Sequence, residues 1–246
     1  MVGLRADALR RVNPVVKLLL LMVGIFHIAL LVHPAVVFLH LLMAVSLVLA
    51  GRVKIRRGFL VGAATTLAGY TWVNYLLFVA NLHLDPGEAL YRVSLLSLRL
   101  VAIILYSAFF VGTTDPRALA TSLTLQLGVP YVYSYMSFVT LRAAPLIFQD
   151  LSSMMVFRRV KGYVSPRQPH RYLLSLLMPL LYLSVRRSVT LAIAMESRGF
   201  GKYPSRTYMN PTSVSALDYA FAAAYLAALA ASTLLALYLG GLAPVL

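Results

Sequence analysis

The fold is decided by residues 15–50, VVKLLLLMVGIFHIALLVHPAVVFLHLLMAVSLVLA, which carry a single Lys, Arg, Asp or Glu side chain, that of Lys17. Two apolar runs, 15–32 and 35–50, lie on either side of the dipeptide His33-Pro34. A bilayer core of about 30 Å requires roughly 20 apolar residues per helix, so each run is close to the length of a membrane span. The stretch therefore predicts a tight hairpin of two membrane helices.

The composition of the whole chain also indicates a membrane protein. Of its 246 residues, 61% are hydrophobic and 12% are charged, whereas soluble domains are about 45–50% apolar and about 25% charged. A net charge of +15 would suggest nucleic acid as the partner of a soluble protein. In this apolar background it favours basic cytoplasmic loops beside a lipid bilayer, with no nucleic acid. The chain has no cysteine, which excludes disulfides, thiol catalysis and cysteine-based metal sites.

Three more apolar segments predict membrane spans, at residues 59–80, 93–111 and 217–239. The loop from Asn81 to Tyr91 has no Lys or Arg, whereas the loop before residue 59 carries four basic residues. Cytoplasmic loops are enriched in Lys and Arg, so this asymmetry predicts a cytoplasmic N-terminus. The first span is expected to stay in the membrane as an anchor rather than to be cleaved as a signal peptide.

The middle of the chain contains two further apolar runs, 131–148 and 172–185. If the first run crossed the membrane, alone or together with the second, the basic stretch 149–171 would lie outside, against the usual charge distribution. If neither crosses, residues 115–207 form one cytoplasmic segment with 12 basic and 3 acidic residues. The second account leaves only Arg92 and Arg99 away from the cytoplasmic side, and we prefer it.

The sequence thus predicts an all-α polytopic membrane protein with about five transmembrane helices. Residues 1–112 are expected to form the first four spans, residues 113–216 the cytoplasmic segment, and residues 217–246 the region of the last span. Turn and cap residues divide the cytoplasmic segment into one short helix and two long ones, at about 115–127, 131–161 and 171–198. Pro145 interrupts the first long helix, Pro179 bends the second, and Ser165-Pro166 marks the loop between them. Each long helix would extend roughly 40–45 Å.

Both long helices end in a small or apolar residue, a cation and a glycine. The candidate site residues are Val160, Lys161 and Gly162 in the first helix and Ser197, Arg198 and Gly199 in the second, with Arg158, Arg159, Glu196, Arg142 and Pro145 as supporting candidates. Helix capping alone explains such an ending, because glycine stops the helix and a cation offsets the macrodipole. A second interpretation is that each tip is a plug for a partner's groove, because a cation on a rigid rod can bind carboxylates or carbonyls there. The duplication favours a partner with two equivalent grooves.

Three stretches, which follow one another in order along nearly the whole chain, resemble a known family. They begin with Asn13-Pro14-Val15-Val16-Lys17, continue from Thr113 through Leu127-Gly128-Val129-Pro130-Tyr131 to Leu146, and end with the most specific stretch, Ala194-Met195-Glu196-Ser197-Arg198-Gly199-Phe200. The sequence resembles the transmembrane T component of the energy-coupling factor (ECF) transporters, including the membrane subunit of the cobalt and nickel versions.

The resemblance implies a prokaryotic cell-membrane subunit with partners. In that family two cytoplasmic coupling helices end in Ala-Arg-Gly-like motifs, whose arginines insert into grooves of two ABC-type ATPase subunits. ATP would then be bound by those partners, this chain would need no cofactor or metal, and a small substrate-binding membrane protein (the S component) would carry the vitamin or metal ion. Lys161 departs from the motif, because lysine lacks the planar fork of arginine. The first contact is therefore expected to be weaker, or to use Arg158 or Arg159.

Two other classes of function agree less well with the sequence. The sequence has no phosphate-binding loop with the spacing that ATP hydrolysis requires, and neither a His-Glu-x-x-His nor a Gly-x-Ser-x-Gly motif, so we expect it not to be an enzyme. A stand-alone secondary transporter or channel would need polar groups at the bilayer midplane, and Arg99 is the only charged candidate. His27 and His40, in apolar spans, are expected to be satisfied core histidines.

Overall fold

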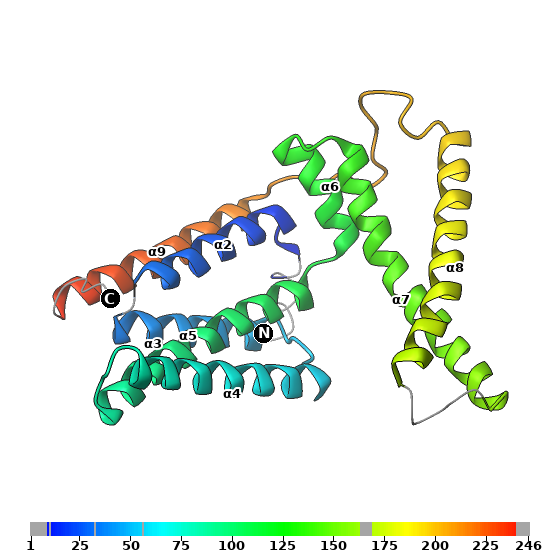
Figure 1. Ribbon diagram of the computed structural model, residues 1–246. Helices are drawn as coiled ribbons and strands as arrows, with labels where there is room; N and C mark the ends of the chain where they lie inside the picture. The colour runs from blue at the N-terminus through cyan, green and yellow to red at the C-terminus, as the bar shows by residue number, and fades with distance from the viewer. Residues whose placement is uncertain (1–8, 10, 32, 56, 163–168, 240–246) are drawn as a thin grey trace. The chain divides into compact units, whose positions relative to one another are not determined.

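The computed structural model describes residues 9, 11–31, 33–55, 57–162 and 169–239 of the chain (Figure 1). Regular structure in these ranges is helical, which confirms the all-α fold class. The main helices are α2 (Pro14–Leu30), α3 (Pro34–Ala50), α4 (Arg57–Ala80), α5 (Pro86–Thr113), α6 (Pro116–Leu127), α7 (Tyr131–Val160), α8 (Pro169–Ser197) and α9 (Ala216–Tyr238).

The chain divides into two compact units, and each is described by itself. The first unit comprises residues 1–119 and 212–246, and the second comprises residues 120–211. The boundary between them falls within α6. The first unit therefore contains the apolar hairpin and the other predicted spans, and the second contains the two long helices.

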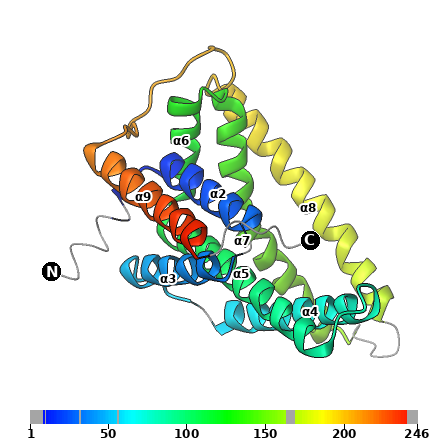
Figure 2. The ribbon, with the colours of Figure 1, turned by 90° about the vertical axis from the view of Figure 1, so that its left-hand side faces the viewer.

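In the first unit, α2, α3, α5 and α9 enclose a common core. Helix α5 packs against α3 and α4, while α9 packs against α2 and α3, and Figure 2 shows α9 running beside α2. The buried core consists of large apolar side chains with one alanine: Leu20, Leu21, Ala44, Val48, Tyr106, Phe109, Tyr225 and Leu229. Helix α4 has no buried residue, so its contact with α5 leaves the rest of its surface for lipid or protein.

Three described helical segments are long and apolar enough to cross a membrane, judged by length and composition. They are α5, α9 and the Leu174–Ser197 part of α8, with mean hydropathies of 2.1, 2.0 and 1.4. Of these three, α5 and α9 correspond to spans predicted from the sequence, whereas the α8 segment was predicted to be cytoplasmic. Helices α2 and α3 have 17 residues each, at the short end of what spans a bilayer core.

Helix α5 begins earlier than the expected span, at Pro86 rather than at residue 93. The Asp85 side chain caps this helix by accepting the Gly87 N–H at 3.1 Å, and Pro86 occupies the first helical position. Arg92 and Glu88 then form an ion pair of 2.7 Å one turn apart. The cap, the proline and the ion pair together stabilise helical structure in residues 86–92, which the sequence predicted to lie in a loop. The loop expected at Ser165-Pro166 lies outside the described residues.

Several polar side chains of the helices in the first unit make hydrogen bonds to other side chains or to backbone carbonyls. His27 Nδ1 lies 2.9 Å from His40 Nε2, and His40 Nδ1 lies 2.9 Å from the Tyr106 hydroxyl. The Arg99 guanidinium donates to the Ala29 carbonyl, and the Lys17 ammonium donates to the Thr113 carbonyl at 3.2 Å. Such pairing lowers the cost of polar groups in an apolar environment.

A buried carboxylate joins the starts of α2 and α9. Asp218 is 1% exposed, and its Oδ1 accepts the Asn13 N–H at 2.6 Å. Its Oδ2 accepts the Ser215 N–H at 2.6 Å and the Ser215 hydroxyl at 2.9 Å. Asn13 in turn caps α2 by accepting the Val15 N–H at 3.0 Å. One side chain thus fixes two helix starts that lie far apart in the sequence.

Candidate functional site: two cation-tipped helix ends

The long helices α7 and α8 run antiparallel within the second unit. Asp150 of α7 and Arg187 of α8 form an ion pair of 2.9 Å. Closer to the end of α7, the Arg158 guanidinium donates to the Ser175 carbonyl at 2.6 Å and also to the Ser175 hydroxyl. Because residues late in α7 meet residues early in α8, the C-terminal tips lie at opposite ends of the pair. For helices of 29 and 30 residues, this separates the tips by about 40 Å.

The supporting candidates divide into occupied and free side chains. Arg158 is held by Ser175 and is half-buried, so it is not available to replace Lys161 as a plug, whereas Arg159 is exposed. Arg142 and Glu196 are both exposed, and neither is in an ion pair within the described part of the chain. Within the described residues, α7 and α8 share the ion pair Asp150–Arg187, which the sequence did not single out. Pro145 lies inside the continuous helix α7.

At the first tip, α7 ends at Val160 and the backbone turns sharply at Gly162. The Lys161 N–H donates to the Phe157 carbonyl and the Gly162 N–H to the Arg159 carbonyl, each at 3.1 Å. Gly162 has φ of 71°, a left-handed conformation that favours glycine. Val160 is 82% exposed and Lys161 is exposed.

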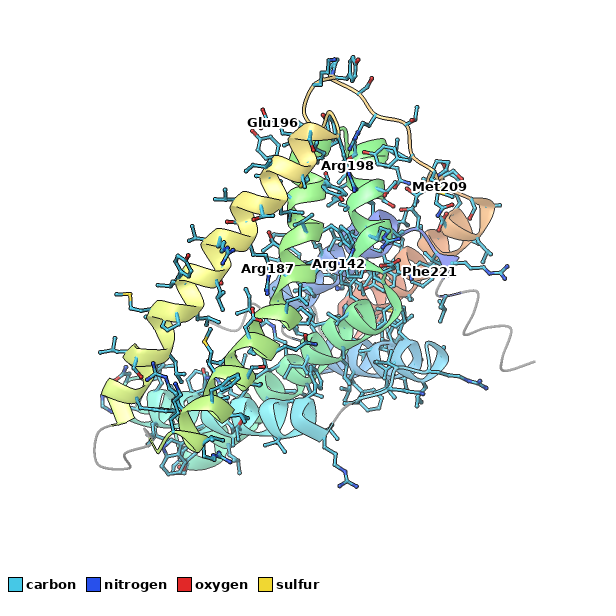
Figure 3. The ribbon with its side chains drawn as sticks, turned by 90° about the vertical axis from the view of Figure 1, so that its right-hand side faces the viewer. Arg142, Arg187, Glu196, Arg198, Met209 and Phe221 are labelled. Atoms are coloured by element: carbon cyan, nitrogen blue, oxygen red, sulfur yellow. The ribbon has the colours of Figure 1, made fainter. Side chains whose placement is uncertain are left out.

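At the second tip, α8 ends at Ser197 and forms a complete Schellman motif. The Phe200 N–H donates to the Met195 carbonyl at 3.0 Å, and the Gly199 N–H donates to the Glu196 carbonyl at 2.8 Å. Gly199 has φ of 74°, close to that of Gly162. The glycine stop expected at both tips is therefore present, and in each case the cation occupies the position directly after the last helical residue. Figure 3 shows Glu196 and Arg198 at the same end of α8, with Arg187 further back along the helix.

An aromatic clamp, formed by Tyr131, Tyr135 and Phe200, holds the backbone that follows the second tip. The Phe200 ring lies 5.5 Å from that of Tyr131 and 5.2 Å from that of Tyr135, between centroids. The Arg206 guanidinium covers the Phe200 ring at 5.3 Å. The segment beyond Arg198 is thus packed against the start of α7, which gives the arginine a fixed base.

Two hydrogen bonds through the Tyr131 hydroxyl complete this clamp. The hydroxyl accepts the Gly201 N–H at 2.9 Å and donates to the Tyr203 carbonyl at 3.0 Å. Sequence reasoning missed the clamp, because residues about 70 positions apart form it. The signal was present in the aromatic residues placed directly after Pro130 and Gly199.

Replacing Tyr131 with phenylalanine should loosen the segment after the second tip while leaving α8 helical. The change removes both hydroxyl bonds but keeps the ring that packs on Phe200. A hydrogen bond contributes about 0.5–1.5 kcal/mol net, so amide exchange in a peptide covering residues 199–206 should become about tenfold faster. Hydrogen–deuterium exchange with mass spectrometry measures this. Tyr133→Phe is the matched control, since that exposed side chain should leave exchange unchanged; equal exchange in both variants would show that the hydroxyl is not a tether.

Comparison with known proteins connects this geometry to a family. A sequence model of the family described as "Cobalt transport protein" (CbiQ) matches residues 6–209. The energy-coupling factor transporter transmembrane protein EcfT of Thermosediminibacter oceani is 30% identical over 169 residues, which cover 59% of this chain and 64% of the relative. The protein of the same name from Heliobacterium modesticaldum is 28% identical over 175 residues, or 61% of this chain and 65% of the relative. The matched part of the chain thus spans just under two thirds of the length of these relatives.

Proposed function

This chain belongs to the CbiQ family of cobalt transport proteins, with EcfT, the transmembrane component of ECF transporters, among its relatives, and from that premise we propose that it is a coupling subunit. It links two cytoplasmic ABC-type ATPases to a small substrate-binding membrane protein, the S component. The complex imports a vitamin or a transition-metal ion. ATP is bound and hydrolysed by the partner subunits, and this chain carries no catalytic residue or cofactor of its own.

The observation that carries the proposal is that the two long helices, α7 and α8, end in the same way. Lys161 and Arg198 each follow the last residue of a long helix, and each precedes a glycine in the left-handed conformation. The two cations stand about 40 Å apart at opposite ends of one antiparallel pair. A pair of identical or related ATPase subunits presents two equivalent grooves, and two rigid plugs suit such a partner.

The two contacts differ in strength under this proposal. Arg198 offers a planar fork that donates two parallel hydrogen bonds to a carboxylate, whereas the Lys161 ammonium acts as a point charge. Arg158 is held by Ser175, so Arg159 is the neighbouring cation left to reinforce the first contact. The ATPase at the second tip is therefore bound more tightly than the ATPase at the first tip.

The contacts between α7 and α8 are weak enough for the two helices to change their angle when their tips move. The Asp150–Arg187 pair is partly exposed, at 26% and 42% of the two side chains, and such pairs contribute little stability. When the two ATPases approach each other, the plugged tips follow them, and the rods pivot about this weakly held region. The movement is transmitted to the S component in the membrane, which then releases its substrate into the cytoplasm.

The proposal places the N-terminus and residues 113–216 in the cytoplasm. Helix α8 is long and apolar enough to span a membrane, but three features favour the cytoplasmic surface. Arg186 and Arg187 lie in the middle of α8, Arg187 pairs with Asp150 of α7, and the basic residues Arg198, Lys202 and Arg206 would otherwise face outward. The apolar face of α8 then lies against the membrane surface or a partner subunit.

Isolation of the complex tests the proposed function. The full chain, carrying an affinity tag, is purified in mild detergent from its own cells, and the bound proteins are identified by mass spectrometry. We expect two ABC-type ATPase subunits and a small membrane protein in stoichiometric amounts. A chain that purifies alone and transports a solute when reconstituted alone would instead establish a stand-alone transporter or channel.

A further inference from the structure

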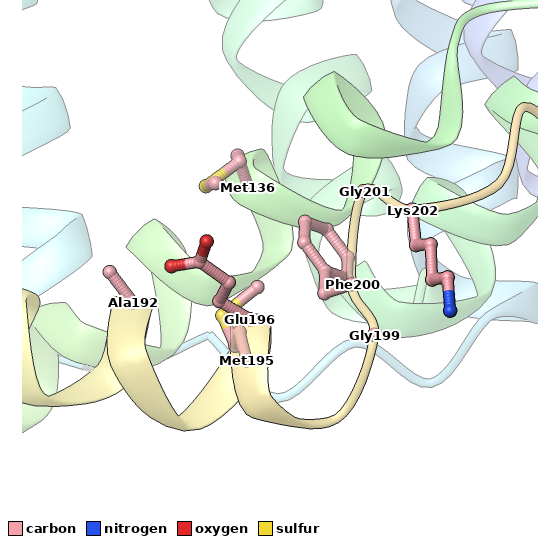
Figure 4. Close-up of a pocket in the computed structure, with 8 residues that line it drawn as sticks. All are labelled: Met136, Ala192, Met195, Glu196, Gly199, Phe200, Gly201 and Lys202. Carbon is pink, nitrogen blue, oxygen red and sulfur yellow. The ribbon is translucent and has the colours of Figure 1, made fainter.

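Beside the second tip the structure contains an open hollow of about 530 Å³. Its walls come from the last turns of α8, from the segment after the tip and from Met136 of α7. Figure 4 shows the lining side chains, which include Ala192, Met195, Glu196, Phe200 and Lys202. The hollow is large enough for a single amino-acid side chain, and it lies within a few residues of Arg198.

The hollow combines apolar walls with one uncompensated carboxylate. In Figure 4 the Glu196 carboxylate points toward Met136, while the Lys202 side chain points away from it. The Lys202 ammonium instead lies 5.5 Å from the centroid of the Tyr203 ring. Within the described ranges Glu196 has no ion pair. The rest of the lining consists of the thioethers of Met136 and Met195, the Phe200 ring, the Ala192 methyl group, the two glycines Gly199 and Gly201, and Lys202.

The position of Glu196 does not serve the stability of its own helix. It lies in the last turn of α8, where the unpaired carbonyls make the helix end partially negative. A carboxylate there is unfavourable for the helix, whereas a cation would be favourable. The tip also combines this single acid with Arg198 and Lys202, so its charge pattern is mixed. Glu196 is therefore better explained by something that it binds than by helix capping.

We propose that this hollow receives a lysine or arginine side chain of the partner ATPase, whose cation pairs with Glu196 beside the Arg198 contact. The aliphatic stem of such a side chain packs on thioethers and an aromatic ring, while its charged head reaches the carboxylate. An anionic group would be repelled, and a purely apolar group would bury the carboxylate without a partner. This inference rests on the proposed function, because it assigns the occupant to the same ATPase.

Under this proposal, each of the two proteins inserts a side chain into the other at the second tip. Arg198 extends into the partner, and the partner extends a cation into the hollow. Opposite charges placed side by side on one surface fix the register of docking, because a shifted partner would bring like charges together. The first tip has no described counterpart of Glu196, since Arg158, Arg159 and Lys161 are all basic there. The two ATPase contacts therefore differ in charge pattern.

Binding of the purified ATPase pair to the detergent-solubilised full chain tests the inference. Glu196→Gln keeps the shape but removes the charge, and it should weaken binding about tenfold; Glu196→Lys should weaken it about a hundredfold. Glu88→Gln, which alters an acid of the first unit, is the matched control and should bind like the wild type. The penalty of Glu196→Gln should also shrink as salt is raised, because salt screens exposed charge pairs.

The possible outcomes separate this inference from the proposed function. If the wild type binds the ATPases and both Glu196 variants bind equally well, the hollow does not hold a partner's cation and the inference alone is overturned. If the wild type does not bind ATPases at all, the proposed function and the inference fall together. A charge reversal offers positive proof: replacing one basic residue of the ATPase with glutamate should restore binding to Glu196→Lys. If no basic residue near the docked tip does so, the inference is overturned.

Discussion

Replacing Lys161 and Arg198 together with alanine should abolish coupling to the ATPases while the chain still inserts into the membrane. Each exposed tip loses its cation, and the partner's grooves keep desolvated acceptors without a donor. Loss of one partner of such a pair costs roughly 2–5 kcal/mol, so the double change should weaken association at least about a hundredfold. Purification of the tagged chain, with quantification of the bound ATPases, measures the loss, and solute uptake by cells should fall with it.

The single variants should be unequal. Arg198→Ala should weaken association more than Lys161→Ala, because arginine provides two directed hydrogen bonds and lysine a point charge. Arg186→Ala is the matched control, since it removes an exposed cation from the body of α8 and should leave ATPase binding unchanged. Normal co-purification and normal uptake in the double variant would rule out the tips as the coupling contacts.

Replacing Asp218 with alanine should destabilise the first unit by about 3 kcal/mol. The carboxylate accepts bonds from the Asn13 N–H, the Ser215 N–H and the Ser215 hydroxyl, all at 2.9 Å or less. Bonds to a charged acceptor contribute more than neutral ones, and their loss leaves buried donors without a partner. Far-UV circular dichroism during titration of the purified chain with a denaturing detergent measures the change.

Asp85→Ala provides the comparison for this effect. Asp85 also caps a helix, but its bond to the Gly87 N–H is exposed, so its loss should cost about 1 kcal/mol or less. The difference between the two variants isolates the link between the starts of α2 and α9. Equal destabilisation by both substitutions would mean that Asp218 acts as a helix cap only.

Features set by neighbouring residues were predictable from the sequence. The glycine stops after Lys161 and Arg198 follow from local backbone conformation, and α7 was expected within one residue of its observed end. The start of α8 at Pro169 came earlier than expected, because proline at a first helical position can begin a helix as well as mark a loop. Local rules therefore predict the presence of a helix more accurately than they predict its first residue.

Contacts between distant residues were not predictable in this way. Asp150 meets Arg187, and Tyr131 meets Gly201, only because α7 and α8 pack in one particular register. One sequence cannot fix that register when both helices present apolar residues on several sides. Ser215 and Asp218 have the spacing of a capping box, but nothing local indicates that Asp218 also bonds to Asn13. The hollow beside Glu196 depends on the same packing.

Crosslinking from the two tips tests the central claim most directly. The chain has no cysteine, so Val160→Cys and Ser197→Cys each carry one thiol beside an intact cation. Each variant is labelled with a photoactivatable maleimide within the assembled complex, and the adducts are identified by mass spectrometry. We predict that each tip crosslinks to an ABC-type ATPase, whereas Leu82→Cys in the α4–α5 loop does not. Intact complexes in which neither tip yields an ATPase adduct would contradict the account.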